Sequence, residues 1–269
     1  MKNITLNTGV TIPVIGSGTN TFGKVDRDYM GAINDDTSEI EAAIKAGYRH
    51  FDTAISYRNE SVVALGIERS GLNRSEFFIT SKIPGKEAYY ETQEAVHKGV
   101  KQSLEALNTD YIDLYLIHHP WDDMEGMLQM WAVLESYVDL GVLKSIGVSN
   151  FTQEQLTTLI QRARIKPAVN QIESHPGKWN GELTAFCLEH GIGVEAWGPL
   201  SRTSQESKDA LEAIGQKYHK TWAQVALRYQ IQRGVIVIPK SHNALRQALN
   251  LELFDFELSP QEMNAIATL

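Results

Sequence analysis

The sequence predicts an α/β protein, a (β/α)8 barrel in which eight parallel strands alternate with helices. Two observations carry this prediction. Short apolar stretches alternate with helical stretches along most of the 269 residues, and three successive apolar stretches end in an ionisable side chain, at Asp52, Lys82 and His118. A doubly wound open sheet would require a G-x-G-x-x-G turn, but after Gly16 and Gly18 the third position of that motif is Thr21. The closed barrel is therefore favoured.

The barrel is expected to begin after a short hairpin. Residues 4–13 alternate apolar and polar side chains around Gly9, which is typical of two antiparallel strands joined by a turn, and we expect this hairpin to plug one end of the barrel. The first helix is expected at residues 37–47, between a Ser/Thr start signal and a glycine stop signal. The intervening loop, residues 19–36, is long for a barrel connection and is therefore a candidate functional segment.

The other elements follow in regular alternation. The strands are expected at residues 14–18, 48–53, 77–81, 112–117, 143–148, 168–171, 193–196 and 235–238. Further helices are expected at residues 60–70, 91–107, 124–140, 153–163, 181–190, 208–218 and 222–233, with extra C-terminal helices at 245–249 and 260–269. Because no linker interrupts this order, residues 1–269 are expected to form one domain.

The composition excludes several classes of partner. With 25 Lys and Arg residues against 33 Asp and Glu residues, the net charge of −8 offers no basic surface for nucleic acid or for an anionic membrane. The single Cys187 cannot form an internal disulfide, and the start of the chain lacks the apolar core of a signal peptide. We therefore expect a cytoplasmic protein that acts on a small molecule as a monomer or, alternatively, as a dimer.

Hydrogen-bonding or aromatic side chains follow seven of the eight predicted strands, on the face where barrel loops build an active site. One such residue alone is more often a turn cap or a satisfied buried group, so the argument depends on their joint placement. These strand-end residues are Asp52, Lys82, His118, Ser149 with Asn150, Gln171 with Glu173, Trp197, and Lys240 with Ser241.

Tyr57 lies in the loop after Asp52, where its phenol can reach the same face. A nearby Lys82 ammonium would stabilise the phenolate and lower the pKa of Tyr57, while Asp52 would hold Lys82 in place. His118 would donate a hydrogen bond to a substrate oxygen. These four residues predict proton donation to a carbonyl.

A metal-dependent hydrolase of the same fold is the main alternative chemistry, because His118 and His119 are adjacent. Adjacent residues of a strand point to opposite faces, so this pair cannot bind one ion inside the barrel while the strand persists. His50 and His175 could join them, but no set of ligands has the spacing of a metal site. No metal is therefore expected.

Motifs along almost the whole chain resemble those of the aldo-keto reductase family. They occur as LNTGVTIP at 6–13, FDTAISY at 51–57 followed by Asn59 and Glu60, ITSK at 79–82, DLYLIH at 113–118, IGVSNF at 146–151, NQIE at 170–173 and IPKS at 238–241. The resemblance implies a barrel that binds NADPH without a Rossmann fold and reduces carbonyls reversibly. It implies that Tyr57 is the proton donor, adjusted by Lys82 and Asp52, and that His118 orients the carbonyl.

The resemblance also assigns residues to the cofactor. These are Ser149, Asn150 and Gln171 at the nicotinamide carboxamide, Trp197 against the nicotinamide ring, Gly198 and Leu200 in the following loop, and Lys240, Ser241, Arg246 and Asn250 at the adenosine phosphate. Trp197 replaces the usual Tyr and can stack equally well. Leu249 lies where a Glu commonly contacts the adenine, so one cofactor contact differs from the family pattern.

The substrate pocket departs further from the family pattern. It is expected to include Asn20, together with Arg58 in place of the usual Gly, Pro84 where a bulky aromatic is common, and His119 in place of the usual Trp. The chain also ends soon after its final helix, which resembles compact microbial members, such as those similar to 2,5-diketo-D-gluconate reductase, that act on small aldehydes, ketones and dicarbonyls. The alternative is a low-turnover NADP-binding barrel with a regulatory or structural role.

Overall fold

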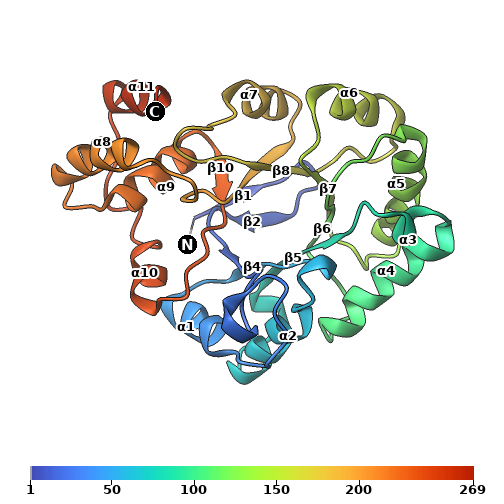
Figure 1. Cartoon of the computed structure of the whole chain (residues 1–269). Helices are drawn as coiled ribbons and strands as arrows, with labels where there is room; N and C mark the ends of the chain where they lie inside the picture. Colours follow the sequence, from blue (N-terminus) through green and yellow to red (C-terminus); the bar gives the residue numbers. More distant parts are fainter. Residues whose placement is uncertain (1) are drawn as a thin grey trace.

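The computed structural model describes residues 2–269, and in it eight parallel strands curl into a barrel (Figure 1). Neighbouring strands pair in sequence order, and a parallel bridge between Ile15 and Val237 joins the two ends of the sheet. The (β/α)8 prediction is confirmed. The strands are β3 (Ser17–Gly18), β4 (His50–Asp52), β5 (Phe78–Ile83), β6 (Leu114–Ile117), β7 (Ile146–Ser149), β8 (Val169–Glu173), β9 (Gly193–Trp197) and β10 (Val235–Val237).

The helices form a layer around the strands (Figure 1). They are α1 (Ser38–Ala46), α2 (Glu60–Arg69), α3 (Glu87–Tyr90), α4 (Gln93–Ala106), α5 (Met124–Asp139), α6 (Gln153–Arg162), α7 (Gly181–Glu189), α8 (Gln205–Gln216), α9 (Trp222–Gln232), α10 (Ala244–Leu249) and α11 (Pro260–Ala267). Helix α8 begins earlier than expected, because the Ser204 side chain caps it by accepting from the backbone N–H of Ser207. Helix α1 ends at Gly47, which has the left-handed φ of 117° that glycine tolerates best.

The N-terminal hairpin covers the end of the barrel where the strands begin. Strands β1 (Asn3–Thr5) and β2 (Thr11–Pro13) pair antiparallel. Leu6 and Ile12 are buried among side chains that lie early in the barrel strands, including Phe78, Leu114 and Val169. The predicted plug is confirmed, because the hairpin closes this end of the barrel.

Side-chain alternation along the strands separates two apolar cores. In β6, Leu114 and Leu116 pack inside the barrel with the hairpin, whereas Tyr115 and Ile117 pack outward against the helices.

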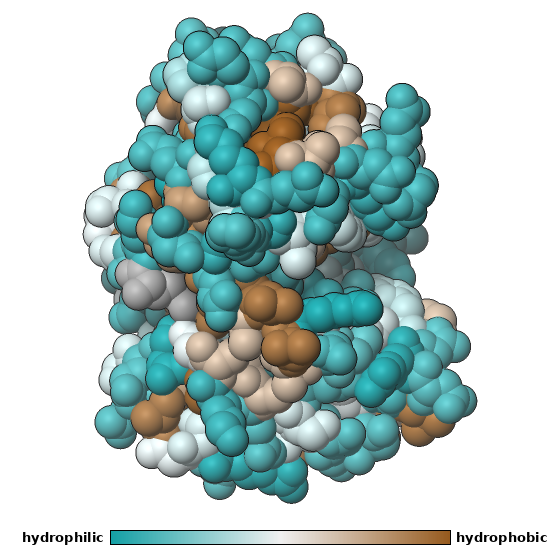
Figure 2. Space-filling model, turned by 90° about the vertical axis from the view of Figure 1, so that its left-hand side faces the viewer, coloured by the Kyte–Doolittle hydropathy of each residue, from teal (hydrophilic) through white to brown (hydrophobic). Residues whose placement is uncertain are grey.

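The face over α8 to α10 is largely hydrophilic, with only small separate hydrophobic areas (Figure 2). Among the helices of residues 2–269, none is both long and apolar enough to cross a membrane.

Candidate active site

Four ionisable side chains meet at the end of the barrel opposite the hairpin. Asp52 ends β4, Lys82 lies near the end of β5, and His118 follows β6 directly. Tyr57 ends η2 (Ile55–Tyr57), the short 3-10 helix after β4. Because the parallel strands of a barrel end on the same rim, residues at these strand ends and in the loops that follow them meet in one place.

Lys82 is the centre of this cluster. Its ammonium donates to both carboxylate oxygens of Asp52 at 2.7 Å, to the carbonyl oxygen of Thr53 at 2.9 Å and to the Tyr57 hydroxyl at 3.3 Å. Burial alone lowers the pKa of Lys82, but the negative charge of Asp52 outweighs it and, with a further contribution from Tyr57, raises that pKa. The lysine is therefore a fixed positive charge beside the phenol.

The acidity of Tyr57 differs from the expectation. Burial raises the pKa of its phenol to about 12, and the opposing effect of Lys82 is smaller. Lys82 acts in the predicted direction, but the prediction of a lowered pKa was wrong because the sequence does not reveal how deeply the phenol is buried. Tyr57 is consequently protonated across the neutral range.

His118 is a neutral imidazole at the edge of Tyr57. The ring centroids lie 5.4 Å apart at an interplanar angle of 82°, and burial followed by the charge of Lys82 lowers the pKa of His118 to about 2. Among residues 2–269 its Nδ1 has no hydrogen-bond partner. A neutral imidazole of this kind can donate one N–H to an oxygen in the cavity.

The two adjacent histidines do not point to opposite faces. Strand β6 ends at Ile117, so the alternation no longer applies, and the rings of His118 and His119 stack 4.4 Å apart at 14°. The exclusion of a shared ion was stated for a strand that continues through both residues, and that condition is not met here. No group of three or more His, Cys, Asp and Glu side chains suited to a metal ion occurs in the described part of the chain.

Three amide or aromatic side chains form a second row beside the ionisable cluster. Asn150 Nδ2 donates to Ser149 Oγ at 3.0 Å and to His119 Nδ1 at 3.1 Å, and Asn150 Oδ1 accepts from the Trp197 indole at 2.8 Å. Gln171 Nε2 donates to Asp52 at 2.7 Å. Asn150 is therefore held between Ser149, His119 and Trp197, whereas Gln171 is held by Asp52.

A buried acid that was not predicted from the sequence lies behind this row. Glu195 on β9 accepts from Gln171 Nε2 at 2.5 Å and lies 3.4 Å from His50 Nε2. Burial, followed by the charge of Asp52, raises the pKa of Glu195 to about 8, and burial lowers the pKa of His50 to about 3. The alternation of side chains along β9 could have predicted this buried acid, because Glu195 lies two residues before Trp197 and so occupies an inward position.

Two adjoining cavities open on this face. The catalytic cavity, of about 510 Å³, contains most of the predicted nicotinamide and substrate residues. It is lined by Asn20, Asp52, Tyr57, His118, His119, Ser149, Asn150, Gln171, Trp197, Gly198, Leu200 and Lys240, among others. Arg202 also lines it, with its guanidinium 5.6 Å from the Trp197 ring, and the sequence analysis missed it.

The second cavity, of about 560 Å³, shares Leu200 and Lys240 with the first. The predicted adenosine-phosphate residues Ser241, Arg246 and Asn250 line it. Leu249 lines it too, together with Lys208 and Trp222, which the sequence analysis missed. Lys208 and Trp222 belong to α8 and α9, and no motif in the sequence relates them to residues 240–250.

Two predicted pocket residues are not placed as expected. Arg58 and Pro84 do not line the catalytic cavity. The Arg58 guanidinium turns instead to the carbonyl oxygens of Tyr29 and Gly31, both at 3.2 Å, because its backbone adopts a left-handed φ of 61°. Tyr29, from the long loop, stands edge to face with Tyr57 at a ring-centroid distance of 5.9 Å, so this loop borders the ionisable cluster.

The chain is similar to proteins of one known enzyme family. The aldo/keto reductase family model matches residues 14–269. A glyoxal reductase of Bacillus subtilis is 42% identical over 266 residues, which cover 99% of this chain and 92% of that protein. A 9,11-endoperoxide prostaglandin H2 reductase of Trypanosoma cruzi is 38% identical and covers 98% of this chain and 89% of its own length.

Solved structures agree with these relatives. An aldo/keto reductase from Brucella melitensis superposes with a TM-score of 0.90 at 37% identity, covering 99% of this chain and 98% of that one. A Bombyx mori aldo-keto reductase in complex with NADP superposes with a TM-score of 0.88 at 37% identity, covering 99% and 92%. The barrel, the strand-end cluster and these similarities agree, and the chain belongs to the aldo/keto reductase family.

Proposed function

We propose that this oxidoreductase reduces small aldehydes, ketones or dicarbonyls to alcohols with NADPH, and that Tyr57 supplies the proton. The observation that carries the proposal is the contact between the Lys82 ammonium and the Tyr57 hydroxyl, 3.3 Å long and at the wall of the catalytic cavity. A protonated phenol beside a buried cation can donate its proton, because the cation then stabilises the phenolate that remains.

The proton step follows from the electrostatics. Reduction places negative charge on the former carbonyl oxygen, and Tyr57 neutralises that charge by transferring its hydroxyl proton. The phenolate that remains lies beside Lys82, which Asp52 keeps charged and oriented. His118, being neutral, can hold the substrate oxygen by an N–H donor without competing for the proton.

The two adjoining cavities fit an NADP-type dinucleotide. The catalytic cavity has amide side chains and the Trp197 indole near Tyr57, as a nicotinamide ring and its carboxamide require. The second cavity has three cationic side chains, Lys208, Lys240 and Arg246, as a phosphate-bearing adenosine requires. When bound, the reduced nicotinamide supplies the hydride.

Individual contacts can be assigned on this basis. Both N–H bonds of the Gln171 amide are directed to the carboxyl groups of Asp52 and Glu195, so only its oxygen remains for the carboxamide N–H of a nicotinamide. Ser149 and Asn150 would contact the same group, and Trp197 would stack on the ring. Ser241, Arg246 and Asn250 would hold the adenosine side, and Gly198 and Leu200 would lie between the two ends.

The relatives suggest the substrate class. The Bacillus subtilis relative is named a glyoxal reductase, and the catalytic cavity of this chain is walled by compact polar groups such as Asn20 and His119. Small dicarbonyls therefore come first among the candidates. We also propose that the chain works as one domain, because residues 15 and 237 close the same barrel.

The test is a substrate panel. Oxidation of NADPH would be followed by absorbance with glyoxal, methylglyoxal, small aldehydes and simple ketones, and with NADH in parallel. We expect turnover with NADPH and the highest kcat/KM among the dicarbonyls. NADPH binding without turnover on any carbonyl would instead support the low-turnover barrel and overturn the proposed reaction.

A further inference from the structure

Lys240 lies where the two cavities adjoin, because it lines both. Its ammonium donates to Thr21 Oγ1 at 2.9 Å and to Asn20 Oδ1 at 3.0 Å. Among residues 2–269 no carboxylate forms an ion pair with it, so its charge is not neutralised by contact. One of the three N–H bonds of the ammonium remains for an anion.

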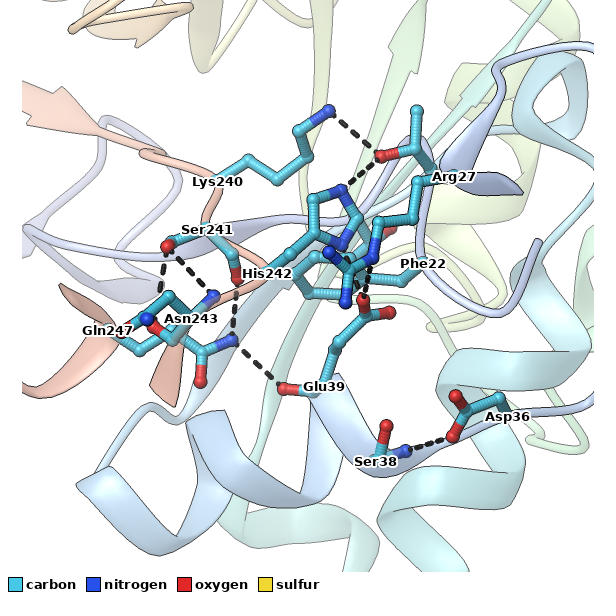
Figure 3. A network of polar contacts seen from close by, with 12 residues as sticks. Phe22, Arg27, Asp36, Ser38, Glu39, Lys240, Ser241, His242, Asn243 and Gln247 are labelled. Atoms are coloured by element: carbon cyan, nitrogen blue, oxygen red, sulfur yellow. Dashed lines mark hydrogen bonds and ion pairs between the residues drawn. The ribbon is translucent and has the colours of Figure 1, made fainter. Parts of the chain in front are cut away.

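A chain of hydrogen bonds continues from Lys240 to an acid on α1 (Figure 3). The ammonium can only donate, so Thr21 Oγ1 accepts from it and has its own proton free for His242 Nε2, 2.9 Å away. His242 Nδ1 then carries the imidazole proton and donates to the Glu39 carboxylate. This series of hydrogen bonds ends at the Glu39 carboxylate, which is connected to Lys240 through the imidazole and Thr21.

The imidazole is held on several sides. Phe22 lies edge to face with the His242 ring, 5.3 Å away, and Arg27 Nε lies 3.4 Å from Glu39 Oε1. Gln247 Nε2 donates both to the carbonyl oxygen of Glu39 at 3.1 Å and to that of Ser241 at 2.9 Å. Helix α1, the long loop and the segment that precedes α10 are thereby tied together (Figure 3).

We propose that His242, held by Glu39 and acting through Thr21, is a positioning residue that fixes the Lys240 ammonium for a phosphate-bearing nucleotide. The inference rests on the proposed function and deepens it, because it explains how Lys240 is prepared for the cofactor. Burial of Lys240 lowers its pKa, and Glu39 is the charge that opposes this effect, which agrees with an electrostatic connection along the chain.

The expected effect is modest and lies in affinity. A free lysine must lose the freedom of several rotatable bonds when it binds a phosphate, whereas a lysine already held by Thr21 loses less. Releasing it should weaken nucleotide binding by about 2- to 10-fold. The effect should require the Lys240 ammonium, because His242 itself lines neither cavity.

The test is a double-mutant cycle read by binding. Dissociation constants for NADP+ and for adenosine 2′,5′-bisphosphate would be measured by quenching of tryptophan fluorescence, since Trp197 and Trp222 line the two cavities. His242→Phe keeps a planar ring beside Phe22 and removes both nitrogens. We expect it to weaken both ligands by about 2- to 10-fold in the wild-type background and to have no further effect in Lys240→Met.

A second route and a matched control complete the experiment. Thr21→Val removes the linking hydroxyl with little change in shape and should reproduce the loss if His242→Phe does not fold. Glu39→Gln should weaken binding, whereas Glu41→Gln, on the same helix and paired with Arg69, should not. If His242→Phe weakens binding equally with and without Lys240, or not at all, the inference is overturned. If the wild-type protein binds neither ligand, the proposed function itself fails.

Discussion

The two cavities differ in whether the charged side chains around them are paired. Around Tyr57 the charged groups are buried and paired, with Lys82 against Asp52 at 2.7 Å. Around the second cavity Lys208, Lys240 and Arg246 have no carboxylate partner within residues 2–269. A buried pair is suited to fixing the acidity of one group, whereas unpaired cations are suited to an anion that arrives from solution. Substitutions in the two regions should therefore separate chemistry from cofactor affinity.

The largest expected effect is on the chemical step. Tyr57→Phe should lower kcat for carbonyl reduction by about 10²- to 10⁴-fold, because the donated proton is lost. NADPH affinity, measured by fluorescence quenching, should stay nearly unchanged because the ring remains. Near-wild-type turnover on a good substrate would show that another acid serves the reaction, and a lowered melting temperature with normal kcat would indicate a packing role.

Breaking the buried pair should lower stability as well as the rate of reduction, because Lys82 also stabilises the proposed Tyr57 phenolate. Lys82→Met leaves the Asp52 carboxylate buried without its cation, which should reduce the free energy of unfolding by about 3–5 kcal/mol. Urea unfolding would measure this loss. The double variant Asp52→Asn, Lys82→Met should recover much of it, since no charge then remains unpaired, and equal losses in the single and double variants would contradict the assignment.

In the second cavity the expected effect is on one cofactor only. A hydrogen bond to a charged group contributes about 1.5–3 kcal/mol, so Arg246→Ala should weaken NADPH by roughly 10- to 150-fold. NADH lacks the 2′-phosphate and should bind almost as before. Equal losses for both cofactors, measured as dissociation constants, would show that Arg246 supports the fold or the shared pyrophosphate instead.

The last prediction tests the buried acid Glu195 through the pH dependence of stability. The pKa of Glu195 is about 8 in the folded chain against 4.5 as its ordinary value, so the folded state holds this proton longer than the unfolded state. Stability should therefore fall as pH rises between these values, by up to about 1.4 kcal/mol per pH unit. Glu195→Gln removes this dependence.

Unfolding in urea at several pH values would detect the difference. The stability of Glu195→Gln relative to wild type should increase from about pH 4.5 to about pH 8 and stay level outside that window. Glu206→Gln, in the first turn of α8 and exposed, serves as the matched control. A constant difference across the window would show that Glu195 is already ionised, with its charge stabilised by its neighbours.

Local patterns were sufficient for the barrel and for the position of its chemistry. Strands and helices follow from short-range periodicity. Because the strand ends of a parallel barrel share one rim, the sequence alone predicts that Asp52, Lys82 and His118 lie close together. The residues proposed to bind the cofactor came from the family resemblance, and they line two adjoining cavities that share Leu200 and Lys240.

The tertiary structure decided how deeply these groups are buried and which distant side chains meet. Burial depth reversed the expected acidity of Tyr57, because desolvation outweighs one nearby ammonium. The direction of the Arg58 side chain depended on a left-handed backbone angle, and the contact of Gln171 with both Asp52 and Glu195 depended on the curvature of the closed sheet. The connection from Glu39 to Lys240 joins residues about two hundred positions apart, a distance that no local pattern spans.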